Sequence, residues 1–276
     1  MNGGATRAGR RVLLAAVVIS GAIVALLARP TAIDVFFHRI ETPPLSLSDT
    51  SRSVAPDAIF AIRVDPETNA TSHRPQAYIW LGMGERAKAS PHVLQQNYKH
   101  GIQRIPLALQ ETEIPVIAAV NGPAIGAGFD LANMCDIRIG STNAQFGETF
   151  VNLGIIAGDG GAWFLQRLVG YQRAAELTFS GRIVKAEEAK QLGILLEVTE
   201  PAALLPRARE LAAKIAAKPP LAVRYAKRLL KLAQQQPLTE HLDVCSSFQA
   251  LCHKTDDHAE ALAAFFEKRA GKFQGR

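Results

Sequence analysis

The chain has few cysteines: three in 276 residues, at Cys135, Cys245 and Cys252. An odd, sparse set of thiols excludes the disulfide framework of a small secreted domain. The spacing also matches no structural zinc pattern. We therefore predict a cytoplasmic protein that folds around a hydrophobic core in a reducing compartment. Cys135 stands in an apolar run and is expected to be a small buried residue.

The chain has fewer acidic than basic residues, 25 Asp and Glu against 31 Lys and Arg, which gives a formal net charge of +6. No RNA-binding aromatic motif or zinc-finger spacing accompanies the basic residues. Apart from an N-terminal group, they cluster only at Lys227, Arg228 and Lys231, which we interpret as a solvated helix face. We expect no nucleic-acid partner, whereas a phosphate-bearing ligand such as coenzyme A would suit this charge.

The first 81 residues lack the regular patterns of a globular domain. Residues 12–28 read VLLAAVVISGAIVALLA, without charge and flanked by arginines. This length is at the short end for a membrane span, and the preceding basic group resembles a signal anchor. We interpret residues 1–30 as signal-anchor-like, with a buried helix as the alternative, so membrane attachment is the second option for localisation. Residues 31–81 are predicted to be divergent or irregular, with a loop rich in proline and serine.

Regular patterning begins near Gly82. Ser90 and Pro91 form a helix start, with serine as the cap and proline in the first turn. Apolar residues then recur at helical spacing, which predicts one amphipathic helix over residues 92–110.

A glycine-rich turn follows a short apolar run. Residues 115–120, PVIAAV, predict a strand buried on both faces, and a helix is expected over residues 129–134. Between them, Gly126 and Gly128 flank Ala127, and small residues let a ligand approach the backbone. Free amides at the helix start could stabilise an oxyanion. A packing turn is the equal alternative, and the glycine spacing does not fit a dinucleotide fold.

This segment resembles the enoyl-CoA hydratase/isomerase (crotonase) family. The resemblance rests on IPVIAAVNGPAIGAGFDLANMCDIRIGSTNAQFGETFVNLGIIAGDGGAWFLQRLVG, continues through AELTFSGRIVKAEEAKQLGILLEV, and ends with AEALAAFFEKRAGKF. It covers about residues 82–273. It implies an α/β fold with a core of stacked ββα turns over residues 82–200. Residues 201–276 would be a helical region that forms trimers and covers CoA.

The resemblance implies an oxyanion hole built from two backbone amides. One belongs to Ala127. The other comes from a family segment that reads roughly A-G-A-D-L before a methionine, and residues 77–83 here read AYIWLGM. The glycine and aspartate are missing, which a divergent N-terminus or an altered upstream reading frame would each explain.

The resemblance also implies carboxylates that move protons. Relatives that hydrate use two glutamates, at the positions of Asp130 and Phe150 here. Since Phe150 cannot transfer a proton, Glu148 and Asp159 are the further candidates, because other crotonases use carboxylates on these loops. Each has an alternative role: Asp130 as a cap or ion-pair partner of its helix, Glu148 as a solvated turn residue, and Asp159 as a turn residue between glycines.

For the rest of the ligand, the resemblance implies that Phe265 and Lys268 contact CoA, often from a neighbouring subunit of a homotrimer or hexamer. No metal and no permanently bound cofactor are expected, since coenzyme A is part of the substrate. We expect an enzyme that stabilises a thioester enolate. The alternatives are a catalytically impaired acyl-CoA-binding homologue and a membrane-attached member of either kind.

Overall fold

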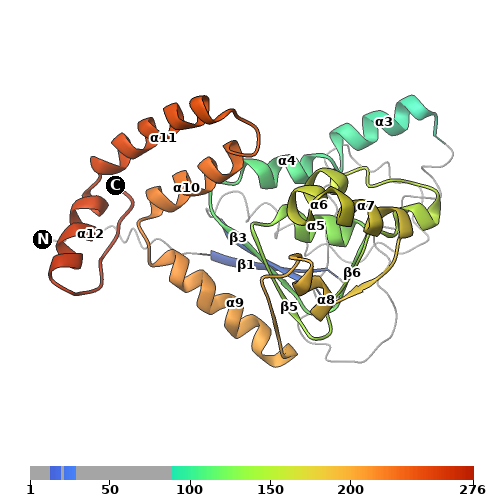
Figure 1. Cartoon of the computed structure of the whole chain (residues 1–276), viewed down its shortest axis with the longest axis horizontal. Helices are drawn as coiled ribbons and strands as arrows, with labels where there is room; N and C mark the ends of the chain where they lie inside the picture. Colours follow the sequence, from blue (N-terminus) through green and yellow to red (C-terminus); the bar gives the residue numbers. More distant parts are fainter. Residues whose placement is uncertain (1–12, 20–21, 29–88) are drawn as a thin grey trace, which may run out of the picture.

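The computed structural model describes residues 13–19, 22–28 and 89–276, the first two stretches as backbone only. Two sheets and the helices packed around them form the body of the molecule (Figure 1). The larger sheet consists, in spatial order, of β1 (Leu13–Ile19), β2 (Ala22–Ala28), β3 (Val116–Val120), β5 (Ile137–Ser141) and β8 (Glu197–Thr199). The smaller sheet consists of β4 (Pro123–Ile125), β6 (Gln145–Gly147) and β7 (Val184–Lys185).

The chain alternates between the two sheets in a repeated ββα pattern. Strand β3 in the larger sheet is followed by β4 in the smaller sheet and then by α5 (Ala127–Met134). Strands β5 and β6 repeat this path before the 3-10 helix η2 (Thr149–Leu153) and α6 (Gly161–Val169). Because β3 pairs in parallel with β5, and β4 with β6, successive turns stack on one another. This is the stacked ββα core expected from the resemblance.

Strand β3 is buried on both faces, as its unbroken apolar run predicts. Alternate side chains of a strand point to opposite sides. Ile117 and Ala119 therefore share a cluster with Leu204 and Ala208 of α9 (Pro201–Ala216), whereas Ala118 belongs to the second cluster, with α5 and α6. The strand is thus packed against α9 on one face and against α5 and α6 on the other.

The predicted single helix over residues 92–110 is wrong in one respect, because the structure divides it. Helix α3 (Pro91–His100) ends at Gly101, and α4 (Arg104–Glu111) begins after a short turn. Gly101 has φ −111° and ψ −108°, a conformation outside the helical region. The predicted cap is confirmed, since the Ser90 hydroxyl accepts a hydrogen bond from the Val93 amide at 3.4 Å.

The apolar N-terminal segment contains two strands in place of the expected single helix. Strands β1 and β2 pair antiparallel, and β2 pairs antiparallel with β3. The sequence between the two runs is Ser20-Gly21, a dipeptide typical of turns, and valine and isoleucine favour strands. In the part of the chain that the structure describes, no helix has both the length and the apolar character needed to cross a bilayer.

Helices make up the C-terminal part of the chain. Beyond α7 (Tyr171–Ser180), α8 (Ala186–Gln191) and α9 come α10 (Pro220–Leu232), α11 (Leu238–His253) and α12 (Asp256–Phe266). In Figure 1 helices α11 and α12 extend away from the sheets, and α12 lies at the far end from α6 and α7.

The interpretation of the basic cluster on α10 as a solvated face is wrong for Lys227. This side chain is 7% exposed and forms an ion pair with Asp136 at 2.6 Å. Lys231 donates to the carbonyls of Leu109 and Gln110 at the end of α4, and burial lowers its pKa to about 8. A lysine at a helix C-terminus satisfies carbonyls that lack an intrahelical partner. These lysines therefore attach α10 to the core.

Candidate active site

The glycine-rich turn places an unpaired amide at the start of α5. Gly126 precedes the helix with φ +56°, which favours glycine over any residue with a Cβ. Its carbonyl accepts from the amides of Phe129 at 2.8 Å and Asp130 at 3.0 Å. Within the described residues, the amides of Ala127 and Gly128 have no acceptor. The amide of Ala127 thus lies at the positive end of the helix dipole, where a developing negative charge is stabilised.

Three buried carboxyl groups come together beside this turn. Asp130 is 0% exposed, Glu148 2% and Asp159 5%. The Asp130 carboxyl interacts with both others, because each of them raises its pKa. The structure thus brings together three residues predicted from the sequence. The alternatives of a solvated turn residue for Glu148 and a helix cap for Asp130 are wrong, because Glu148 is buried and Asp130 accepts no amide hydrogen bond among the described residues.

A glycine makes room for the central carboxyl. A Cβ at Gly161, the first residue of α6, would overlap the Asp130 carboxylate. The Gly158-Asp159-Gly160-Gly161 segment therefore has two roles. Asp159 contributes its own carboxyl group, and Gly161 leaves the space that the Asp130 carboxyl occupies. The N-terminus of α6 also adjoins this space, and its dipole favours negative charge in the cluster.

Protons must be shared inside this cluster. No described N–H or hydroxyl donor reaches either oxygen of Asp130 or Glu148. Burial raises the pKa of Asp130 well above its ordinary value, and hydrogen bonds with Asp159 and Glu148 raise it further. Burial also raises the pKa of Glu148, although a hydrogen bond from Asp130 opposes this. Two carboxyls can form a hydrogen bond only if one is protonated, and the stronger rise in the pKa of Asp130 favours Asp130 as the protonated member of the pair.

The raised pKa values predict how stability depends on pH. Between the ordinary carboxyl pKa near 4 and the raised values, the folded chain binds more protons than the unfolded chain. The cluster should therefore make its full contribution to the free energy of unfolding at low pH. This contribution should fall as the pH rises through this window. Asp130→Asn keeps the shape of the neutral acid without a titrating proton. Urea unfolding from pH 4 to 8 should show the variant gaining stability relative to wild type as pH rises, and a pH-independent difference would contradict shared protonation.

Sequence reasoning missed the contacts that hold the Asp159 loop. The Gln103 side chain, between α3 and α4, donates to the Gly158 carbonyl at 2.9 Å. The Tyr98 ring lies against Gly158 so closely that a Cβ there would overlap it. Because Gln103 and Gly158 are 55 residues apart, no local pattern links them.

Phe150 occupies the position where hydrating relatives were expected to have their second glutamate. Its ring carbon Cζ lies 3.4 Å from where a Cβ on Gly126 would be. The side of the turn that faces Phe150 is therefore apolar, and the carboxyl groups lie on Glu148, Asp130 and Asp159.

The residues expected to contact CoA lie elsewhere in this chain. Phe265 is 76% exposed near the end of α12, and Lys268, just beyond it, is exposed with φ +53°. Helix α12 lies far from α5 and α6 (Figure 1). Within one chain these two residues therefore do not join Gly126, Ala127 and Gly128. The segment predicted to supply the first oxyanion amide, residues 77–83, lies outside the described residues.

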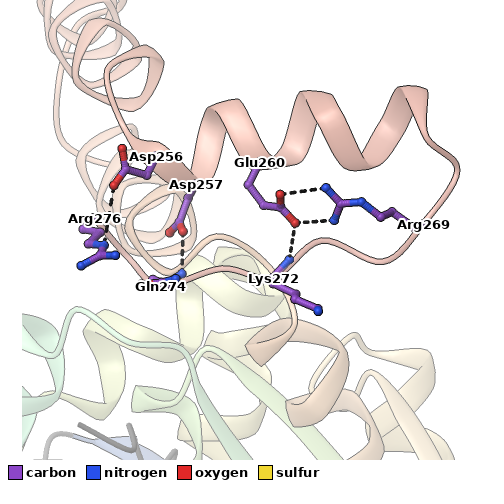
Figure 2. A pocket seen from close by; sticks show the side chains of 7 residues that line it. All are labelled: Asp256, Asp257, Glu260, Arg269, Lys272, Gln274 and Arg276. Atoms are coloured by element: carbon purple, nitrogen blue, oxygen red, sulfur yellow. Dashed lines mark hydrogen bonds and ion pairs between the residues drawn. The ribbon is translucent and has the colours of Figure 1, made fainter. Parts of the chain in front are cut away.

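A hollow of about 390 Å³ near the C-terminus differs from the carboxyl cluster, because its charges are paired. Figure 2 shows Glu260 facing Arg269, with Asp257 beside Gln274. Arg269 donates to Glu260 at 2.5 and 2.9 Å and holds the pKa of that carboxyl low, at about 2. The amides of Gln274 and Gly275 both donate to Asp257 at 2.5 Å. These contacts fold the tail back onto α12, whereas Asp130 and Glu148 have no such N–H partners among the residues that the structure describes.

The fold and this turn define an α/β protein of the crotonase class. A solved enoyl-CoA hydratase from Bacillus anthracis superposes with a TM-score of 0.66 at 36% identity, covering 70% of this chain and 75% of that one. One from Geobacillus kaustophilus gives 0.64 at 38% identity, covering 70% and 74%. The family model for enoyl-CoA hydratase/isomerase matches residues 81–276. The chain belongs to the enoyl-CoA hydratase/isomerase family, and the resemblance seen in its motifs is confirmed.

Curated relatives match the same region. A short-chain-enoyl-CoA hydratase from Clostridium acetobutylicum is 43% identical over 161 residues, 58% of this chain and 62% of that protein. A crotonyl-CoA hydratase from Syntrophomonas wolfei is 39% identical over 171 residues, 62% and 66% respectively. The chain thus spans less than two thirds of the length of either relative.

Proposed function

We propose that the protein processes acyl-CoA thioesters by proton transfer through an enolate. The observation that carries the proposal is the unpaired amide of Ala127, one helical turn from the buried carboxyl cluster. Membership of the enoyl-CoA hydratase/isomerase family supports it, as does the CoA-thioester chemistry in the names of its relatives.

In this mechanism Glu148 acts as the base. Its carboxylate takes a proton from the carbon next to the thioester carbonyl, and the C–H electron pair moves into the carbonyl to form an enolate. The enolate oxygen faces the amide of Ala127, which stabilises the new charge. If the proton on Glu148 is first replaced by one from solvent, its delivery to the same carbon gives exchange. If the substrate is unsaturated, delivery to the far end of the conjugated dienolate gives a shifted double bond. Protonated Asp130 holds Glu148 in place and lowers the cost of its charge.

Proton transfer is favoured over water addition because of Phe150. Hydration in relatives relies on two carboxylates that place one water, and here an apolar ring occupies one of these positions. We therefore place isomerisation or exchange ahead of hydration.

The residues that bind the CoA part of the substrate are proposed to come from a second copy of the chain. Phe265 and Lys268 are exposed and distant from α5, so a homotrimer or hexamer would bring them to the site of a neighbour. Adjacent exposed rings of Phe265 and Phe266 support burial in such an assembly.

Exchange of α-protons tests the function directly. The full chain is incubated with butyryl-CoA in D2O, and loss of the α-proton signal is followed by NMR. We expect exchange far above the buffer rate. A catalytically impaired binding protein is the alternative, favoured by Phe150, and it would bind butyryl-CoA without exchange. Absence of both binding and exchange would contradict either function.

A further inference from the structure

A mostly apolar pocket of about 210 Å³ opens beside Glu148. Its wall includes Phe150 of η2, Ile156 of the following loop, Ala162 in the first turn of α6, and Thr178 of α7. Apart from the carboxyl of Glu148 and the hydroxyl of Thr178, the side chains lining it are apolar. Such a lining favours an uncharged, hydrophobic ligand group.

A second observation connects this pocket to the chemistry. Glu148 is only 2% exposed, borders the pocket, and has no described N–H or hydroxyl donor for either oxygen. Phe150, on the same wall, packs against Gly126, the residue before the oxyanion amide. A thioester carbonyl at Ala127 would therefore have its acyl chain directed along Phe150, with its reacting carbon next to Glu148.

We propose that this pocket holds the acyl group of the substrate and that Thr178 limits the size of that group. This proposal rests on the proposed function. An apolar cavity of about 150 Å³ takes up benzene. The pocket here is somewhat larger, so it suits an unbranched acyl group of roughly four to six carbons or a single aromatic ring. Longer chains would meet helix α7, and an acyl group with a terminal charge would lose its hydration without gaining a partner.

Thr178 is suited to this test because it lies outside the proton-transfer machinery. It belongs to α7, whereas the carboxyl cluster is built from α5, the residue before η2 and the loop before α6. Thr178→Ala should deepen the pocket, and Thr178→Leu should make it shallower. Gln172→Leu is the matched control, because Gln172 is an exposed residue of the same helix.

The experiment measures the Kd of the full chain for acetyl-, butyryl-, hexanoyl- and decanoyl-CoA by calorimetry. These saturated thioesters bind without net reaction. For wild type we expect affinity to rise by about fourfold per methylene group while the chain fits, and to stop rising after hexanoyl-CoA. The optimum should move to a longer chain in Thr178→Ala and to a shorter one in Thr178→Leu, with no change in Gln172→Leu.

The outcomes separate this inference from the proposed function. If wild type binds acyl-CoA and exchanges α-protons but neither Thr178 variant moves the optimum, the pocket assignment is wrong and the proposed function stands. If wild type binds no acyl-CoA, both are wrong. Misfolding would weaken binding of all four ligands without moving the optimum, and if one variant fails to fold, the opposite variant decides.

Discussion

Replacing Ala127 with proline should slow α-proton exchange by about 10²- to 10³-fold, the cost of losing one oxyanion donor. Proline removes the N–H and places its ring carbon Cδ where the amide hydrogen was, and Ala127 is the first residue of α5, where proline is well tolerated. The amide there has no described acceptor, so its loss should leave the fold intact. The affinity for butyryl-CoA should fall less than the exchange rate, because the interaction strengthens as the enolate forms.

Two variants control for this change. Ala127→Ser keeps the amide and should retain most of the activity. Tyr171→Pro places proline at the first residue of α7, also after a glycine, and changes an exposed side chain. If Ala127→Pro exchanges protons as fast as these controls, the Ala127 amide is not part of an oxyanion hole.

The Glu148→Gln variant should lose about 10²- to 10⁴-fold in exchange rate, the usual contribution of a general base. Glutamine has nearly the same shape but cannot accept a proton, so the pocket and the affinity for butyryl-CoA should persist. Removing a buried ionisable group without a cationic partner should also leave the protein at least as stable above neutral pH.

Glu200→Gln is the matched control for Glu148→Gln, since Glu200 is an exposed glutamate before α9. Exchange rates of the two variants and wild type are compared by NMR, together with urea unfolding. Full exchange activity in Glu148→Gln would assign the base to another residue, and Asp159→Asn would then be the next variant to measure.

Local sequence patterns were sufficient for the elements that form the turn. The apolar run of β3, the small residues around Ala127 and the apolar start of α5 are all read within a few residues of one another. The prediction of a buried Cys135 is also confirmed, at 4% exposed. Asp130, Glu148 and Asp159 could be selected because the family motif orders them along one continuous segment.

Long-range contacts could not be predicted in this way. The burial of Lys227 depends on Asp136, 91 residues earlier, and the loop that carries Asp159 depends on Gln103. Neither side chain differs in type from an ordinary surface residue. The apolar residues 12–28 gave the wrong secondary structure because apolar content alone does not separate a helix from two short strands. In the structure, β2 pairs antiparallel with β3, and this long-range pairing cannot be read from residues 12–28 alone.

The central claim concerns a backbone amide that polarises a thioester carbonyl, and infrared spectroscopy measures this polarisation. Butyryl-CoA labelled with ¹³C at the carbonyl is bound to wild type and to Ala127→Pro, and the carbonyl stretch is recorded in difference spectra. A hydrogen bond to the oxygen weakens the C=O bond and lowers its frequency. We predict a lower frequency for wild type than for the same thioester in water, and a partial return toward the value in water for the variant. Equal frequencies for both proteins, unchanged from those in water, would contradict the account.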